Sequence, residues 1–154
     1  WVILAGYVSG GVCRGLLVGT VVIGISLLFT TIPVIHLGLS CLVFLLTAIL
    51  FALAGFINAV FADSFDDISI IPNFILTPLT YLGGVFYSVD MLPELWQKIS
   101  LANPILYIVN SFRYGLIGVT DIDITVALTM IISFIVALII FSLYLLKKGV
   151  GIKQ

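Results

Sequence analysis

The chain alternates between long uncharged stretches and short polar breaks. An apolar helix of about 20 residues is needed to cross the ~30 Å hydrocarbon core of a bilayer. The uncharged stretches predict four such spans, at residues 9–31, 38–60, 68–87 and 124–146. The first two spans share a run of 48 residues without Asp, Glu, Lys or Arg, which a turn near Pro33 must divide. The predicted fold is therefore an all-α integral membrane protein.

Residues 88–119 follow an apolar stretch, yet they are too polar and too often interrupted to form an ordinary crossing. Leu92, Leu95, Trp96 and Ile99 recur at helical spacing. Asn103 is a favourable N-cap and Pro104 a favourable first residue for a second helix that runs to about Gly118. That helix is only about 21 Å long. Such a broken pair needs protein or water around its free backbone groups, which predicts a re-entrant helical hairpin between the third and fourth spans.

Composition and charge strengthen the membrane assignment and add an orientation. The chain is 62% hydrophobic and 8% charged, with a mean hydropathy of +1.37. Its net charge of −1 does not suggest a nucleic-acid partner. With four crossings, Arg14 and the closing lysines at 147 and 148 lie on the same side, which the positive-inside rule makes cytoplasmic. The hairpin is then on the outer side.

Small residues in the first span point to close helix packing. Gly11, Gly15 and Gly19 repeat every four residues, a spacing that lets another helix approach closely. Packing within the chain is favoured over a subunit interface. Arg14 is interpreted as a snorkelling anchor at the cytoplasmic interface, with binding of anionic cargo or lipid headgroups as the alternative. His36 is interpreted as a surface residue of the outer turn rather than part of a proton relay.

One face of the second hairpin helix carries polar side chains. Tyr107, Asn110, Ser111 and Tyr114 share that face, and Arg113 lies beside it. A polar stripe at this depth predicts an outer gate or translocation path, and Arg113 is expected to pair with an acidic residue or with backbone carbonyls. For the aromatic residues Tyr87, Trp96 and Tyr107 the alternative is an interfacial belt at headgroup level.

The same region resembles a known family. Y-L-G-G-V-F-Y-S at 81–88 is followed by M-L-P, W-Q, N-P-I-L-Y and F-R-Y-G, and this succession is similar to the C-terminal part of ABC-2 type export permeases. The resemblance extends from Ala5-Gly6-Tyr7 to the terminal lysines. Those permeases are membrane subunits of bacterial ATP-driven exporters of drugs, lipids or polysaccharides. The resemblance does not indicate the cargo.

The resemblance implies a partner, a location and a coupling element. It implies that a separate ABC ATPase subunit works with the permease. It also implies a permease dimer, most simply a homodimer, in contact with membrane lipids. The expected location is the bacterial inner membrane, which the chain would cross several times. It also implies that residues 1–154 form one transmembrane domain whose N-terminal part is missing. The cytoplasmic loop that follows the second span would be the element that docks on the ATPase. Its residues are Asp63, Ser64, Phe65, Asp66 and Asp67.

Two other classes of function fit the sequence less well. A passive channel with a re-entrant pore helix would conduct without nucleotide, but the spans hold no ring of charges and no filter-like run of carbonyls. A membrane-embedded enzyme is disfavoured because no span contains paired titratable groups and no catalytic motif occurs. The chain also lacks a phosphate-binding P-loop, so ATP would be held by the partner. We expect no metal or cofactor bound by this chain.

Overall fold

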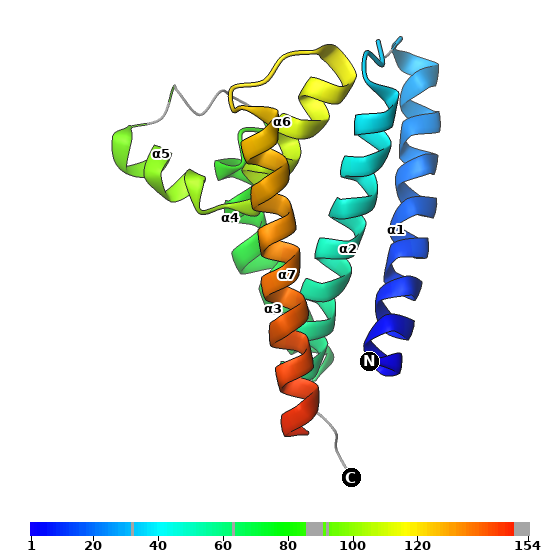
Figure 1. Cartoon of the computed structure of the whole chain (residues 1–154), viewed down its shortest axis with the longest axis vertical. Helices are drawn as coiled ribbons and strands as arrows, with labels where there is room; N and C mark the ends of the chain where they lie inside the picture. The colour runs from blue at the N-terminus through cyan, green and yellow to red at the C-terminus, as the bar shows by residue number, and fades with distance from the viewer. Residues whose placement is uncertain (32, 63, 86–90, 92, 150–154) are drawn as a thin grey trace.

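Every regular element in the described part of the chain is a helix. The computed structural model describes residues 1–31, 33–62, 64–85, 91 and 93–149. Three of its helices are long and apolar enough to cross a membrane. They are α1 (Val2–Phe29), α2 (Leu37–Phe61) and α7 (Ile124–Lys148). In Figure 1 they run roughly side by side, with the start of α1 and the end of α7 at the same end of the molecule.

The three long helices agree with the predicted spans, with one extension. The predictions at 38–60 and 124–146 fall within a residue or two of α2 and α7. The first helix, by contrast, already begins at Val2 rather than at residue 9. Its apolar pattern continues in front of Arg14, and a single arginine does not interrupt a helix because Arg has high helix propensity.

The core lies between α2, α7 and α6 (Pro104–Ile117). Leu53 on α2, Leu106 on α6 and Ile131 on α7 are almost completely buried. Leu4 is the buried residue of α1, which packs mainly against α2. Much of α1 is therefore left exposed in this chain, and Figure 1 shows it at the edge of the bundle.

The predicted third span, 68–87, is not one regular helix. The chain forms α3 (Phe65–Ile70), a π-helical segment η1 (Ile71–Leu76) and α4 (Thr77–Leu82), each of six residues. Pro72 and Pro78 lie in the first turns of the second and third segments. Neither proline has an N–H, so the regular ladder cannot continue through them. The wider π-helical turn between them was not predicted.

The predicted hairpin region 88–119 contains two short helices in its described part. They are α5 (Glu94–Leu101) and α6, and residues 86–90 and 92 lie outside the described residues. The predicted boundaries of α6 are confirmed. The side chain of Asn103 caps its N-terminus, Pro104 is its first residue, and Gly118 ends it with a positive φ of 74°. In Figure 1 α5 projects sideways from the bundle while α6 lies against it.

Candidate functional site

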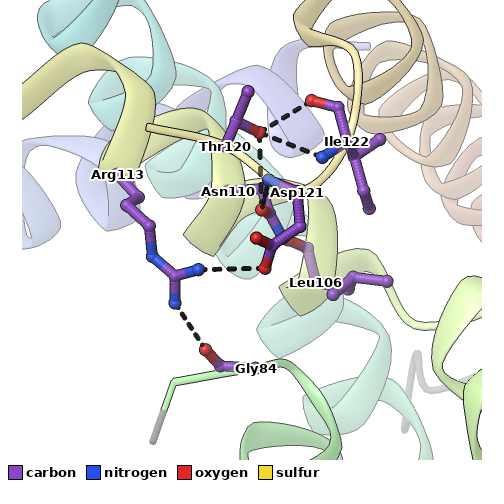
Figure 2. Close-up of polar contacts among 7 residues, drawn as sticks. All are labelled: Gly84, Leu106, Asn110, Arg113, Thr120, Asp121 and Ile122. Carbon is purple, nitrogen blue, oxygen red and sulfur yellow. Dashed lines mark hydrogen bonds and ion pairs between the residues drawn. The ribbon is translucent and has the colours of Figure 1, made fainter. Parts of the chain in front are cut away.

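Arg113 joins two segments that are distant in sequence. Its Nη1 lies 3.1 Å from Oδ2 of Asp121, and its Nη2 donates to the carbonyl of Gly84 at 2.8 Å. Figure 2 shows the guanidinium between these two acceptors. The expected pairing of Arg113 with a carboxylate or a backbone carbonyl is confirmed, and both kinds of acceptor are present. Arg113 thereby ties the end of α4 to the loop that leads into α7.

Asn110 fixes the loop that carries Asp121. Its Oδ1 accepts from the N–H of Asp121 at 3.0 Å and from the hydroxyl of Thr120 at 3.4 Å. Its Nδ2 donates to the carbonyl of Leu106 at 3.0 Å, and the residue is 1% exposed. Figure 2 shows this short network below Thr120. Because Asn110 holds the backbone of Asp121, it also sets where the carboxylate can meet Arg113.

The start of α6 is attached to α4 by a single side chain. Asn103 accepts from the N–H of Ile105 at 3.0 Å, which makes it the N-cap. Its amide nitrogen donates to the carbonyl of Leu79 at 2.6 Å. That carbonyl is free because the next turn tightens, with the N–H of Gly83 bonded to Thr80 instead. Asn103 thus satisfies open backbone groups on both helices while it is 1% exposed.

The end of α6 is attached to the turn between α1 and α2. The N–H groups of Ile35 and His36 donate to the carbonyls of Leu116 and Gly115 at 3.3 and 2.8 Å. These are two of the carbonyls that a helix end leaves without an internal partner. Gly115 lies directly against Ser40, where a side chain would overlap it. The ring of His36 stacks on Tyr114 with a centroid distance of 5.1 Å.

These contacts make α6 a hub, which we call the α6 cluster. It consists of α6 with the partners of its polar side chains and ends: Gly84, Leu79, Asp121, Thr120, Ile35 and His36. The predicted polar face faces the protein interior in this chain, since Tyr107, Asn110 and Ser111 are buried. The hydroxyl of Tyr107 donates to Leu101 at 2.6 Å. Trp96 lies on α5 and is 45% exposed, and Tyr87 lies outside the described residues.

The loop after α2 forms the start of α3. Ser64 and Asp67 make a reciprocal capping box, in which each side chain accepts from the other residue's N–H. Asp63 lies outside the described residues, as do the side chains of Phe65 and Asp66. The predicted coupling role of this loop stays a prediction. Its local geometry is a capped start of a helix.

Sequence reasoning missed Asn58, whose side chain joins α2 to α3 by a hydrogen bond. Its amide nitrogen donates to the carbonyl of Ile68 at 2.9 Å. In a regular helix that carbonyl would accept from residue 72, but Pro72 has no N–H. Asn58 is 8% exposed and replaces the missing donor. The signal was available, because an asparagine in an apolar helix close to a proline-containing span suggests such a replacement.

Gly11, Gly15 and Gly19 of α1 face α2 within the chain. A Cβ at Gly11 or Gly15 would meet Ala52 or Ala48, and one at Gly19 would overlap the ring of Phe44. The interpretation of Arg14 as an interfacial anchor stays a prediction. It assumed a helix end near residue 14, whereas α1 extends twelve residues on the N-terminal side, to Val2, and on to Phe29. Arg14 is therefore not close to either end of its helix.

Comparison with known proteins identifies the family. A family model described as ABC-2 type transporter matches residues 1–117. Inner membrane transport permease YadH of Escherichia coli strain K12 is 49% identical over 153 residues, which are 99% of this chain and 60% of that protein. Nodulation protein J of Rhizobium leguminosarum bv. viciae is 24% identical over 103 residues, 67% of this chain and 40% of that protein. No solved structure matches significantly.

The chain spans three fifths of the length of the YadH permease. Both the family model and the YadH match cover most of it, and the resemblance found in the sequence motifs is confirmed. Together with the three apolar helices, they identify a multi-pass transporter membrane component of the bacterial inner membrane. The chain belongs to the ABC-2 type transporter family.

Proposed function

We propose that this chain forms part of the translocation path of an ATP-driven exporter and works with a separate ATPase subunit. The observation that carries the proposal is the family match over residues 1–117, joined by 49% identity to a transport permease. The absence of a P-loop motif from the printed sequence adds to it, because nucleotide would then be bound by another chain. The cargo would be a drug, a lipid or a polysaccharide, and the permease would act as a dimer.

In this proposal the chain crosses the membrane four times and α5–α6 form the outer hairpin. The broken segments α3, η1 and α4 are the third crossing, supported by the strictly uncharged sequence from Ile68 to Tyr87. Helix α6 has 14 residues, about 21 Å, which is too short for a crossing of its own. At the start of α6, Asn103 donates to Leu79. At its end, Ile35 and His36 donate to carbonyls of α6. These bonds would supply the sheltered environment that a re-entrant helix needs.

The α6 cluster is the proposed outer gate. Arg113 and Asn110 hold α4, α6 and the loop before α7 together, so separating these segments requires breaking their bonds. At the opposite end, the capped start of α3 is the proposed docking element for the ATPase. Movement there would reach the gate along α3, η1 and α4, because α4 is bonded to both Asn103 and, through Gly84, Arg113.

Cross-linking of the full-length permease tests both the partner and the loop. A cysteine at Ser64 is expected to cross-link to the ATPase in the assembled complex, whereas a cysteine at Glu94 on α5 is the matched control and should not. ATP turnover of the complex should respond to cargo. If the Ser64 variant turns over ATP but never cross-links, the docking role is wrong. If no ATPase assembles with the permease, the ATP-driven function itself is wrong.

A further inference from the structure

A cavity lies between the π-helical segment η1 and the long helices α2 and α7. Its volume is about 290 Å³, and α4 and the start of α6 complete its wall. We call it the η1 cavity. Each of these five elements contributes to the lining, which includes Leu50, Asn58, Ile75, Leu79, Ile105 and Leu138.

Two hydrogen bonds attach the chain on either side of η1. Before η1, the amide of Asn58 donates to the carbonyl of Ile68 at 2.9 Å. After it, the amide of Asn103 donates to the carbonyl of Leu79 at 2.6 Å. Between these two points η1 packs mainly against its sequence neighbours α3 and α4. The two bonds therefore hold η1 beside α2 and α7, while the space between them stays open as the η1 cavity.

The lining of the η1 cavity is apolar. Asn58 is the one polar side chain among the described residues that line it, and its amide nitrogen is already bonded to Ile68. A buried water needs two to four polar partners, so this lining is unsuited to water. An empty cavity is costly as well, because the atoms around it lose their contacts. Hydrocarbon is therefore the favoured content.

The η1 cavity lies at the depth of the hydrocarbon core. Leu50 and Leu138 lie near the midpoints of α2 and α7, which have 25 residues each and are long and apolar enough to cross a membrane. Two of the lining residues, Gly55 and Ile75, are exposed, so the cavity opens to the side between α2 and η1. At this depth, a lateral opening meets the acyl chains of the bilayer.

The size of the η1 cavity restricts its occupant. An engineered apolar cavity of about 150 Å³, roughly half this volume, binds one benzene molecule. A helix with its side chains is about 10–12 Å across, which is too wide for the η1 cavity. A flexible hydrocarbon chain can enter it. A charged headgroup would find no partner in the apolar lining and would stay outside.

We propose that the η1 cavity binds one acyl chain of a bilayer phospholipid, which enters between α2 and η1. The phospholipid is a structural ligand. Its acyl chain fills the space behind the π-helical segment and keeps η1 at its distance from α2 and α7. This inference concerns the folded membrane domain and does not depend on the cargo or on the ATPase.

Photolabelling of the full-length permease tests the occupant. The protein is reconstituted, without ATPase or ATP, in vesicles of phosphatidylethanolamine and phosphatidylglycerol in which a small fraction of the phospholipid carries a diazirine midway along one acyl chain. Adducts are expected at Leu50 and Ile105, which line the cavity although they are only 3% and 7% exposed. Leu53 and Leu106 are also buried, do not line the cavity and are the controls. No adducts at Leu50 and Ile105, or equal labelling of all four residues, would overturn the proposal.

Narrowing the cavity tests whether these adducts form inside it. Ala54 lines the cavity, and Ala54→Leu should reduce the yield of adducts at Leu50 several-fold. Ala59→Leu is the matched control, because Ala59 is exposed on the same helix and does not line the cavity. Labelling of Ile132, which is 49% exposed on α7, should be equal in all three proteins if they insert alike.

Two further outcomes would contradict the proposal. A wild-type yield at Leu50 in the Ala54→Leu protein would place the labelled chain outside the cavity. Adducts at Leu50 that form only after the ATPase and ATP are added would mark a transported molecule instead of a resident phospholipid.

Discussion

Arg113 has two acceptors, one located 29 residues before it and the other eight residues after it. The chemistry of this pairing could be predicted from the sequence, because a guanidinium at membrane depth must be satisfied. Its partners could not, since the sequence contains no local signal that brings Gly84 beside α6. Asn103 is the opposite case. Its capping role depends on neighbours two residues away, and for that reason it was predicted correctly.

The first prediction concerns the pair of Arg113 and Asp121. Their side chains are 25% and 23% exposed, so part of the charge interaction is screened by solvent. Arg113→Ala should lower the free energy of unfolding by about 1–2 kcal/mol, because it also leaves the Gly84 carbonyl without its donor. Chemical unfolding of the purified permease in detergent measures this. Arg113→Lys is expected to recover only part of the loss, because an ammonium group lacks the two separate nitrogens with which the guanidinium reaches Asp121 and Gly84.

A double-mutant cycle separates the carboxylate from the carbonyl. If the pair contributes, Asp121→Ala should cost less in the Arg113→Ala background than in the wild type. Strictly additive effects would show that Arg113 acts through Gly84 alone. The same variants report on the proposed gate, because a loosened α6 cluster should raise ATP turnover without cargo.

At the scale of elements, the long helices could be predicted from hydropathy, whereas the division of the third span into α3, η1 and α4 could not. Apolar stretches bounded by polar residues predicted α2 and α7 closely, because the bilayer sets the length of a crossing. The use of charges as boundaries failed at Arg14, where a charge lies inside a helix. In the third span, Pro72 and Pro78 lie at the starts of η1 and α4. The bond from Asn58 to Ile68, just before the π-helical turn, joins two helices and leaves no signal in the spacing of the sequence.

The second prediction tests whether Asn58 replaces the donor that Pro72 lacks. Asn58→Ala leaves the carbonyl of Ile68 unpaired and should lower the free energy of unfolding by about 1–2 kcal/mol. Pro72→Ala provides an N–H at the position where a regular helix would need it. In that background the cost of Asn58→Ala should therefore be clearly smaller. An equal cost in both backgrounds would mean that Asn58 contributes through packing and not through this bond.

At the scale of the whole molecule, two observations bear on how the chain sits in the membrane. The start of α1 and the end of α7 lie at one end of the bundle, and the α1–α2 turn lies with α6 at the other. Arg14 lies inside α1 and does not mark a helix end. The prediction of the cytoplasmic side therefore depends on Lys147 and Lys148 at the end of α7. The proposed topology is unchanged, because those lysines alone indicate the cytoplasmic end.

The third prediction is the topology itself. In a background without Cys13 and Cys41, single cysteines at Ser64 and Lys148 should react with a membrane-impermeant thiol reagent only from the cytoplasmic side. A cysteine at Glu94 on α5 should react only from the outer side. The measurement is labelling of intact cells against inverted vesicles. Labelling of the Lys148 position in intact cells would reverse the orientation, and labelling of Ser64 and Glu94 from one side would remove the third crossing.

The length of α1 has a consequence for the lipids around it. Its 28 residues extend about 42 Å, well beyond a hydrocarbon core of ~30 Å. Such an excess is taken up by tilt or by local thickening of the bilayer. Within the described residues α1 packs mainly against α2, and its Gly11, Gly15 and Gly19 lie at that contact. Thicker or thinner bilayers should therefore act first on the angle between α1 and α2, which makes this pair the part of the molecule most responsive to acyl-chain length.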